Sequence, residues 1–214
     1  MLGLWHRTET AAALWPLLPP GLAPIYHTLQ PATADANRLR QWLAARVLLH
    51  RLLPELLPTD SETWLENDAS GRPLLRGPRP AATTVAVSHS GEWAAVLLSV
   101  RDSVGVDIEV VRGKAQRLAA KFLSETEAAA AALTPTAAHF TLLWSAKETL
   151  YKLAGRRGLI FKTQLLLDDF EPVASGTIPA VLWLDGVATR HRVCYCQLAP
   201  GYVLTYAVGT SMSE

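Results

Sequence analysis

The segment from Trp144 to Lys152 contains two lysines and a glutamate at helical spacing. Glu148 and Lys152 are one turn apart, so on a helix they share a face with Trp144. A carboxylate and an ammonium group beside aromatic surface are unfavourable to bury unless they pair or bind a ligand. An ordinary ion pair on a solvated helix has the same spacing. The segment alone leaves a catalytic face and a salt-bridged helix surface both open.

Two further carboxylates, Asp107 and Glu109, are separated by one residue in a strand-like stretch. Alternation along a strand puts them on one face and Val106 and Ile108 on the other. Oxygen-only ligands of this kind suit Mg²⁺, which keeps several waters and accepts substrate phosphates. The polar face of an edge strand would show the same pattern. A magnesium site is therefore one of two interpretations here.

Small polar residues and an imidazole, at Ser88 and His89, follow a strand-like run. Such a loop could hold a phosphate, or it could only cap a hairpin. Arg72 lies between glycine and proline, where a rigid turn could present it to an anion, although most turns of this composition are only turns.

Basic residues at Lys114, Arg117 and Lys121 share one face of an expected helix. A basic stripe with apolar neighbours can receive an acidic partner helix, and a solvated face is the competing interpretation. Arg46 is one of several arginines on an earlier helix whose role the spacing leaves open.

The elements that must position these residues come in blocks of helix, strands, helices and strands, which is typical of α+β proteins. A helix over 33–53 has Thr33 or Asp35 as its cap and Pro54 as its end. Strands are expected over 85–88 and 94–100, joined by a hairpin loop over 89–92, and over 104–110. Later helices are expected over 114–122, from Ser124 with a capping box to Glu127, and over 137–153 with Gly155 closing the last one. Four strands follow, over 164–167, 180–184, 190–197 and 202–208.

Composition excludes several classes of protein. Half of the 214 residues are hydrophobic and the net charge is +1, which argues against a nucleic-acid-binding protein. The start of the chain does not read as a signal peptide, and no apolar run approaches a membrane span. Cys194 and Cys196 alternate along a strand, where a disulfide is disfavoured, so reduced thiols in a cytoplasmic protein are expected.

Taken in order and spacing, five blocks resemble the 4′-phosphopantetheinyl transferase superfamily in its long, Sfp-type form. The resemblance covers the middle of the chain and rests on Gly71-Arg-Pro73, Val87-Ser-His-Ser90, Gly105-Val-Asp-Ile-Glu109, Phe122-Leu-Ser-Glu-Thr-Glu127 and Trp144-Ser-Ala-Lys-Glu-Thr-Leu-Tyr-Lys152. It implies two similar α/β subdomains related by a pseudo-twofold axis, with coenzyme A and Mg²⁺ in the cleft between them. The expected subdomains are 1–103, with the nucleotide contacts, and 104–214, with the metal and catalytic residues.

The resemblance also implies roles for individual residues. Asp107, Glu109 and Glu148 would surround Mg²⁺, and Glu148, Lys152 and Asp107 would form the catalytic centre. Phosphate charge would be steadied by Lys147 and Lys152. The coenzyme A nucleotide would be held by Arg46, Arg72, Ser88 and His89.

The implied reaction is Mg²⁺-dependent transfer of 4′-phosphopantetheine from coenzyme A to a serine of an acyl or peptidyl carrier protein, as in fatty acid, polyketide or nonribosomal peptide biosynthesis. The carrier would dock on the stripe formed by Lys114, Arg117 and Lys121, and the enzyme is expected to act as a monomer without nucleic acid or membrane. A coenzyme A-binding regulatory protein without transfer activity, or a magnesium-dependent phosphohydrolase, would be the alternatives.

Overall fold

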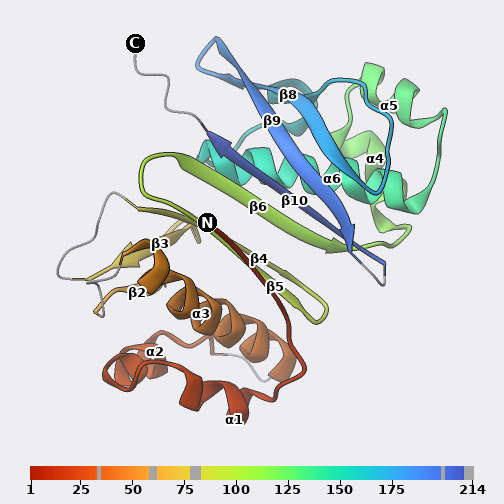
Figure 1. Ribbon diagram of the computed structural model, residues 1–214. Helices are drawn as coiled ribbons and strands as arrows, with labels where there is room; N and C mark the ends of the chain where they lie inside the picture. Colours follow the sequence, from red (N-terminus) through yellow and green to blue (C-terminus); the bar gives the residue numbers. More distant parts are fainter. Residues whose placement is uncertain (33–34, 58–61, 78–82, 199–200, 210–214) are drawn as a thin grey trace. The chain divides into compact units, whose positions relative to one another are not determined.

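The computed structural model describes residues 1–32, 35–57, 62–77, 83–198 and 201–209 (Figure 1). The chain divides into two compact units, Met1–Asp102 and Ser103–Glu214. Each contains helices and antiparallel sheet, which confirms the expectation of a mixed α and β architecture. The division falls one residue before the expected boundary. The pseudo-twofold relation, the cleft and the roles assigned to the two halves stay predictions.

The first unit is built on a three-stranded antiparallel sheet and one long helix. The strands lie in the order β1 (Leu2–His6), β5 (Trp93–Ser99) and β4 (Thr84–Ser90). Helix α3 (Ala36–Leu56) packs its buried leucines on this sheet. The smaller elements are α1 (Ala11–Leu14), η1 (Trp15–Leu17), η2 (Pro20–Leu22), α2 (Ala23–Leu29), β2 (Trp64–Asn67) and β3 (Pro73–Arg76).

Helix α3 begins where its sequence predicts and ends later. The Asp35 carboxylate accepts hydrogen bonds from the backbone N–H groups of Asn37 and Arg38, which satisfies donors that a helix start leaves unpaired. The other predicted cap, Thr33, lies outside the described residues. The prediction that Pro54 ends the helix is wrong, because α3 continues to Leu56 with the proline inside its last turn. A proline has no backbone N–H, so Pro54 cannot donate to the carbonyl four residues earlier, and the last turn forms with one helical hydrogen bond fewer.

The hairpin between β4 and β5 is tighter than its sequence suggests. Strand β4 extends to Ser90, which pairs with Trp93, so only Gly91 and Glu92 form the turn. Gly91 has a φ of 53°, a conformation that two-residue hairpin turns require and glycine adopts readily. The expected loop over 89–92 is therefore wrong at its first two positions, which belong to the strand.

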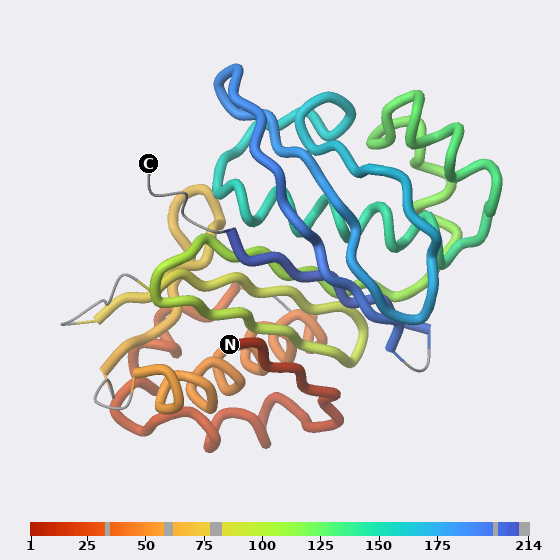
Figure 2. Tube along the Cα trace, turned by 45° about the horizontal axis from the view of Figure 1, so that its top comes forward, coloured from red at the N-terminus to blue at the C-terminus, as the bar shows by residue number. Residues whose placement is uncertain are grey.

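The second unit is a five-stranded antiparallel sheet with a long helix across one face (Figures 1 and 2). The helix is α6 (Ala137–Ala154), and it packs most closely on the two strands at one edge of the sheet. The strands lie in the order β6 (Ser103–Val110), β10 (Tyr202–Gly209), β9 (Val187–Leu198), β8 (Ser175–Leu184) and β7 (Leu165–Leu167). The other helices are α4 (Lys114–Phe122), α5 (Glu125–Ala131) and α7 (Phe161–Gln164).

Local sequence signals predict the helices of this unit well. Helix α4 has the expected bounds, and α6 ends at Gly155, whose φ of 61° is left-handed. The capping box is confirmed: the Ser124 side chain accepts from the N–H of Glu127, and the Glu127 carboxylate accepts from the N–H of Ser124. Strands β8 and β9 are longer than expected, since they start at Ser175 and Val187.

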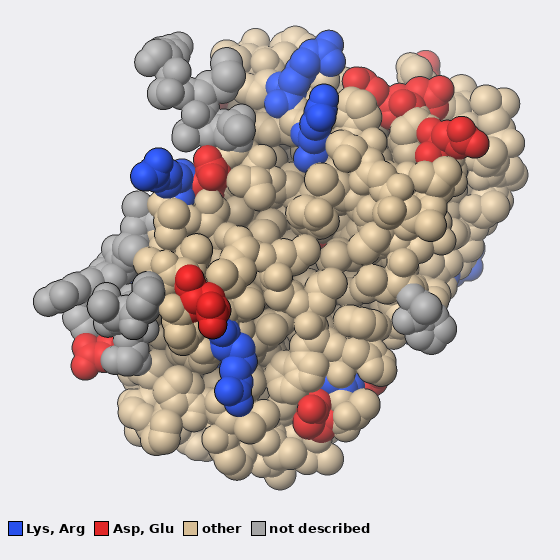
Figure 3. Space-filling view, viewed as in Figure 1, with Lys and Arg blue, Asp and Glu red and all other residues tan. Residues whose placement is uncertain are grey.

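The distribution of charged side chains on the surface and the hydropathy of the helices agree with the near-neutral net charge of the chain. The face in Figure 3 shows acidic and basic side chains in small separate groups among uncharged residues, without a continuous basic area among the described residues. No helix within the described ranges is long and apolar enough to span a membrane. Cys194 and Cys196 are both free thiols.

Candidate active site

Strand β6 and helix α6 bring the predicted catalytic residues together within the second unit. Asp107 is 4% exposed and lies on the face of β6 that α6 covers. Lys152, in the last turn of α6, donates from Nζ to Asp107 Oδ1 at 2.8 Å and to the backbone oxygen of Val106 at 2.9 Å. A charge-assisted hydrogen bond of this length joins the motif on the strand to the motif on the helix.

Glu148 lies one turn before Lys152 in an acidic environment. Burial first, and then the negative charge of Asp107, raise the pKa of Glu148 to about 7. Lys152 lowers this pKa, and Glu109 raises it further. A carboxyl group that titrates near neutrality is suited to accept and release a proton at physiological pH.

Glu109 receives a hydrogen bond from the helix as well. Trp144 donates from its indole Nε1 to Glu109 Oε1 at 3.2 Å. The indole is held by a stacked contact with Phe161 and an edge contact with Phe122, at ring-centre distances of 5.6 and 5.2 Å. Trp144 therefore combines packing with an orienting contact to a predicted metal ligand.

The carboxylates suit a hard divalent cation by their chemistry. Asp107, Glu109 and Glu148 offer only oxygen donors, and after burial the negative charges of Asp107 and Glu109 raise the pKa of Glu148. Within the described ranges, no three side chains of His, Cys, Asp or Glu are grouped so that they could hold a metal ion. Mg²⁺ does not require such a cage, because it uses one or two carboxylates together with waters and substrate phosphates.

Lys147 has partners other than the predicted phosphates. It is 0% exposed, and Nζ donates to Glu127 Oε2 at 2.7 Å and to the backbone oxygen of Phe161 at 2.9 Å. Burial lowers the pKa of Lys147, and the bond to Glu127 opposes that change. Contact with phosphate would require this buried pair to open, so the predicted role of Lys147 stays a prediction without support from these contacts.

Arg46, on α3 of the first unit, is also buried. Its guanidinium lies 3.5 Å from the ring centre of Trp42 and donates to the backbone oxygens of Trp42 at 3.0 Å and Leu65 at 3.5 Å. Burial lowers its pKa to about 9, and Tyr26 opposes this shift. The contacts bind Arg46 to the interior of its unit, and the predicted nucleotide contact stays a prediction.

Arg72 is exposed on a well-formed turn between β2 and β3. Asp68 Oδ1 accepts from the backbone N–H groups of Ser70 at 2.7 Å and Arg72 at 3.0 Å. A hydrogen bond from the Ser70 side chain, and then the backbone bond from Arg72, lower the pKa of Asp68. The turn thus holds the backbone of Arg72 in place, as its sequence predicts.

Ser88 and His89 are neighbours on β4, so their side chains point to opposite faces of the sheet. Ser88 is 8% exposed, and His89 is exposed. The structure does not place the two side chains on one face, and a shared nucleotide contact stays a prediction.

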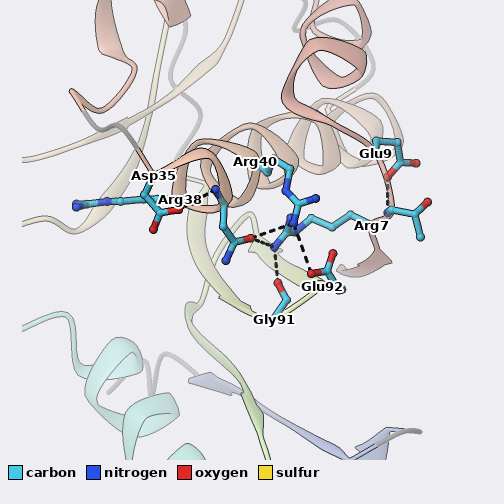
Figure 4. A network of polar contacts seen from close by, with 9 residues as sticks. Arg7, Glu9, Asp35, Arg38, Arg40, Gly91 and Glu92 are labelled. Atoms are coloured by element: carbon cyan, nitrogen blue, oxygen red, sulfur yellow. Dashed lines mark hydrogen bonds and ion pairs between the residues drawn. The ribbon is translucent and has the colours of Figure 1, made fainter.

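Arg7 connects the tip of this hairpin to the start of α3 (Figure 4). It is 0% exposed, and its guanidinium donates to Gly91 O and to Asn37 Oδ1. Arg40 also donates to Asn37 Oδ1, at 3.2 Å, and pairs with Glu92 Oε1 at 3.5 Å. These contacts fix the turn that follows Ser88 and His89, and no sequence motif marks Arg7 for this purpose.

The predicted basic stripe lies on α4, where Lys114, Arg117 and Lys121 are all exposed. The opposite side of the helix packs Ala115, Ala119 and Phe122 against the core. The three cations are thus available to a partner, and their docking role stays a prediction.

Comparison with known proteins places the chain in a family. The profile of the 4′-phosphopantetheinyl transferase superfamily matches residues 103–207. The 4′-phosphopantetheinyl transferase psf-1 of Bacillus pumilus is 31% identical over 172 residues, which cover 75% of this chain and 72% of that protein. The chain belongs to the 4′-phosphopantetheinyl transferase superfamily. The resemblance drawn from the five blocks is confirmed, and the chain is a transferase.

A second member of the superfamily shows a shorter similarity. A phosphopantetheinyl transferase of Thraustochytrium sp. (strain ATCC 26185 / S-3) is 34% identical over 67 residues, which cover 31% of this chain and 23% of that protein. The interval matched by the superfamily profile contains β6, α4 and α6, and therefore Asp107, Glu109, Glu148 and Lys152. The predicted nucleotide residues of the first unit lie outside that interval.

One residue beside the candidate site was not predicted from the sequence. Thr205, on β10, lies directly opposite Asp107 and forms hydrogen bonds with Ser145 and Thr149 of α6. The C-terminal strands carry no motif, so only the pairing of β10 with β6 reveals this position. The four-residue spacing of Ser145 and Thr149 was the one available signal, since it puts two small polar side chains on one face of α6.

Proposed function

We propose that this transferase moves 4′-phosphopantetheine from coenzyme A to the hydroxyl group of a serine in an acyl or peptidyl carrier protein, with Mg²⁺ as cofactor. The observation that carries the proposal is the arrangement of Asp107, Glu148 and Lys152, two carboxyl groups and an ammonium group from adjacent elements. The family membership supports coenzyme A as the substrate and carrier proteins as the acceptors.

In the proposed reaction, the serine Oγ attacks the β-phosphorus of coenzyme A. An O–P bond forms to the carrier, and the bond from phosphorus to the bridging oxygen breaks, so that adenosine 3′,5′-bisphosphate leaves with the electron pair. Glu148 accepts the serine proton, a role that a carboxylate beside the reacting hydroxyl can fill. Lys152 supplies fixed positive charge where the leaving phosphate becomes more negative.

The proposal keeps Asp107, Glu109 and Glu148 around the metal, with one or two of them as direct ligands and contact from the others through water. Bound Mg²⁺ would neutralise the pyrophosphate charge at this place. Lys152 holds Asp107 and the Trp144 indole holds Glu109, so both carboxylates have a defined orientation. Ligand carboxylates that are themselves hydrogen-bonded in this way are typical of metal sites.

In the first unit, the proposal keeps Arg72 and His89 as exposed candidates for the phosphates and nucleotide of coenzyme A. Arg46 and Ser88 are buried, so direct contact would need a rearrangement around each of them. The free thiols Cys194 and Cys196 fit a reducing compartment such as the cytoplasm.

Mass spectrometry of a carrier protein tests the proposal directly. The carrier is incubated with the enzyme, coenzyme A and Mg²⁺, and the expected product carries one phosphopantetheine group on its serine. Asp107→Ala should abolish transfer while circular dichroism shows a folded protein. Coenzyme A binding without modification of any carrier would instead indicate a binding protein. Release of phosphopantetheine without a carrier would indicate a phosphohydrolase, and near-normal turnover of Asp107→Ala would refute the metal assignment.

A further inference from the structure

Three buried hydroxyl groups join α6 to the sheet of the second unit. Ser145 and Thr149 lie one turn apart on α6, Thr205 lies on β10, and all three residues are 0% exposed. Thr205 Oγ1 is 2.8 Å from Ser145 Oγ and 2.6 Å from Thr149 Oγ1. Elsewhere this helix and this sheet pack apolar surface against each other. Buried polar groups are unfavourable unless their hydrogen bonds are formed, so the network constrains how the helix lies on the sheet.

One assignment of protons satisfies every group. The Thr205 hydroxyl donates to the backbone oxygen of Ser145 at 2.9 Å. The hydroxyls of Ser145 and Thr149 then donate to Thr205 Oγ1, and Thr149 Oγ1 also lies 3.2 Å from the backbone oxygen of Thr205. Thr205 Oγ1 is therefore the centre of the network, as one donor and an acceptor for two turns of the helix.

The network lies directly beside the catalytic residues. Thr205 is paired with Asp107 across the β10–β6 ladder. On α6, Thr149 adjoins Glu148 in sequence, and Lys152, three residues later, donates to Asp107 Oδ1. A shift of the helix relative to Thr205 would therefore move Glu148 and Lys152 relative to Asp107.

Gly105 and Thr205 constrain two different aspects of the position of α6: its distance from β6 and its register along the helix axis. A Cβ at position 105 would lie 2.1 Å from the backbone oxygen of Thr149, so glycine allows α6 to lie very close to β6. Glycine has no side chain, so Gly105 does not fix where α6 lies along its own axis. The hydroxyl of Thr205 does fix it, because its bonds to Ser145 and Thr149 are formed in a single register.

We propose that Thr205 is a positioning residue of the transfer reaction: its hydroxyl fixes the register of α6 on the sheet, and thereby the places of Glu148 and Lys152 relative to Asp107. This inference rests on the proposed function. Catalytic groups need placement within about half an ångström, and a misplacement of about 1 Å can reduce turnover roughly 100-fold.

The test compares two isosteric substitutions. Thr205→Val keeps the shape of the side chain and removes the hydroxyl from the centre of the network. Thr141→Val is the matched control, since Thr141 is a 3% exposed threonine on the same helix whose hydroxyl donates to Ala137 O at 2.7 Å. Thr205→Ser restores the hydroxyl alone.

Three measurements are made on each protein: thermal unfolding, Mn²⁺ binding by electron paramagnetic resonance without substrates, and kcat and KM for coenzyme A. Relative to Thr141→Val, we expect Thr205→Val to bind Mn²⁺ several-fold more weakly and to lose about 10- to 100-fold in kcat. The two valine variants should have similar melting temperatures, and Thr205→Ser should recover both properties.

Equal Mn²⁺ affinity and equal kcat in the two valine variants would show that Thr205 is only structural and would overturn the inference. If Thr205→Val does not fold, Ser145→Ala, which removes one donor to Thr205, decides the question by the same measurements. A wild-type protein that binds Mn²⁺ but modifies no carrier would refute the proposed function while the binding comparison still tests the positioning. A wild-type protein that does neither would overturn both.

Discussion

Lys147 Nζ lies 2.7 Å from Glu127 Oε2, and the two side chains are 0% and 5% exposed. The Glu127 carboxylate also accepts from the backbone N–H groups of Ser124 at 2.7 Å and Leu167 at 2.8 Å. The pair therefore connects α5 and α6 with Leu167, the last residue of β7, and it occupies the lysine that neighbours Glu148 in sequence. These contacts tie α6, the helix that carries Glu148, to the rest of its unit.

Removing one member of this pair should destabilise the protein strongly. Lys147→Met leaves the Glu127 carboxylate buried without its counter-ion, and the free energy of unfolding should fall by about 3–5 kcal/mol. The double variant Lys147→Met/Glu127→Leu should recover a large part of that loss. Urea unfolding followed by circular dichroism measures both. Lys114→Met, at an exposed position, should change stability by less than about 0.5 kcal/mol. A single variant as stable as the double one would contradict the prediction.

Trp144→Phe tests the indole contact to Glu109. The smaller ring keeps an aromatic surface against Phe161 but has no donor for Glu109 Oε1. Mn²⁺ affinity should fall by about tenfold or more, because a hydrogen bond that orients a metal ligand is lost. Tyr151→Phe is the control, since Tyr151 contacts the same Phe161 ring at 5.6 Å and should leave the affinity unchanged. Wild-type affinity in Trp144→Phe would mean that the indole only packs.

Gly105→Ala should damage both stability and activity. The new Cβ would meet the Thr149 backbone oxygen at 2.1 Å, and backbone cannot move aside as a flexible side chain can. We expect a loss of about 1–3 kcal/mol in the free energy of unfolding, as for overpacked cores, together with loss of transfer. Gly21→Ala, where a Cβ would meet nothing within 4 Å, is the control. Thermal unfolding and the carrier assay measure the outcome, and a fully active, stable Gly105→Ala would disprove close packing of α6.

His50 should make stability depend on pH. Burial first, and then the charge of Arg46, lower its pKa from 6.5 to about 4. The hydroxyl of Tyr26 accepts from Leu65 N and lies 2.8 Å from His50 Nε2, so it donates to a neutral imidazole. The imidazole of His50 binds a proton more tightly in the unfolded chain than in the folded one. The contribution of neutral His50 to stability is therefore fully present above pH 6.5 and is lost as pH falls toward 4, by up to about 3 kcal/mol.

Urea unfolding between pH 7 and pH 4 measures this dependence. His50→Gln keeps a polar partner for Tyr26 without a titrating ring, so the stability of that variant should fall less over the same range. An identical slope in wild type and His50→Gln would exclude His50 as its source.

Charge reversal on α4 tests the docking proposal. Lys114→Glu and Arg117→Glu together should raise the KM for carrier protein roughly tenfold or more, because an acidic helix would meet like charge. The KM for coenzyme A should stay nearly constant. Arg101→Glu, an exposed change outside α4, is the control. Steady-state kinetics with each substrate varied in turn distinguishes the cases, and equal effects on both KM values would count against docking on α4.

Local sequence patterns were enough to predict most helices and strands and to select the candidate residues of the site. The strand alternation of Asp107 and Glu109, the helical spacing of Glu148 and Lys152, and the capping box of Ser124 and Glu127 all depend on neighbours close in the chain. Short-range patterns of this kind survive folding, because backbone geometry fixes which side chains share a face. The family resemblance rested on the same residues.

Tertiary structure decided which of these side chains meet. Lys147 and Glu148 are adjacent in sequence, yet α6 turns by about 100° per residue, so their side chains point in different directions. The Lys147 side chain is buried, where it donates to Glu127 and to the backbone oxygen of Phe161. Thr205 enters the site because β10 pairs with β6, a pairing across nearly a hundred residues that no local pattern encodes. Long-range packing thus determines which groups each charged side chain contacts. The pKa of Glu148 is raised by burial, which exists only in the folded chain.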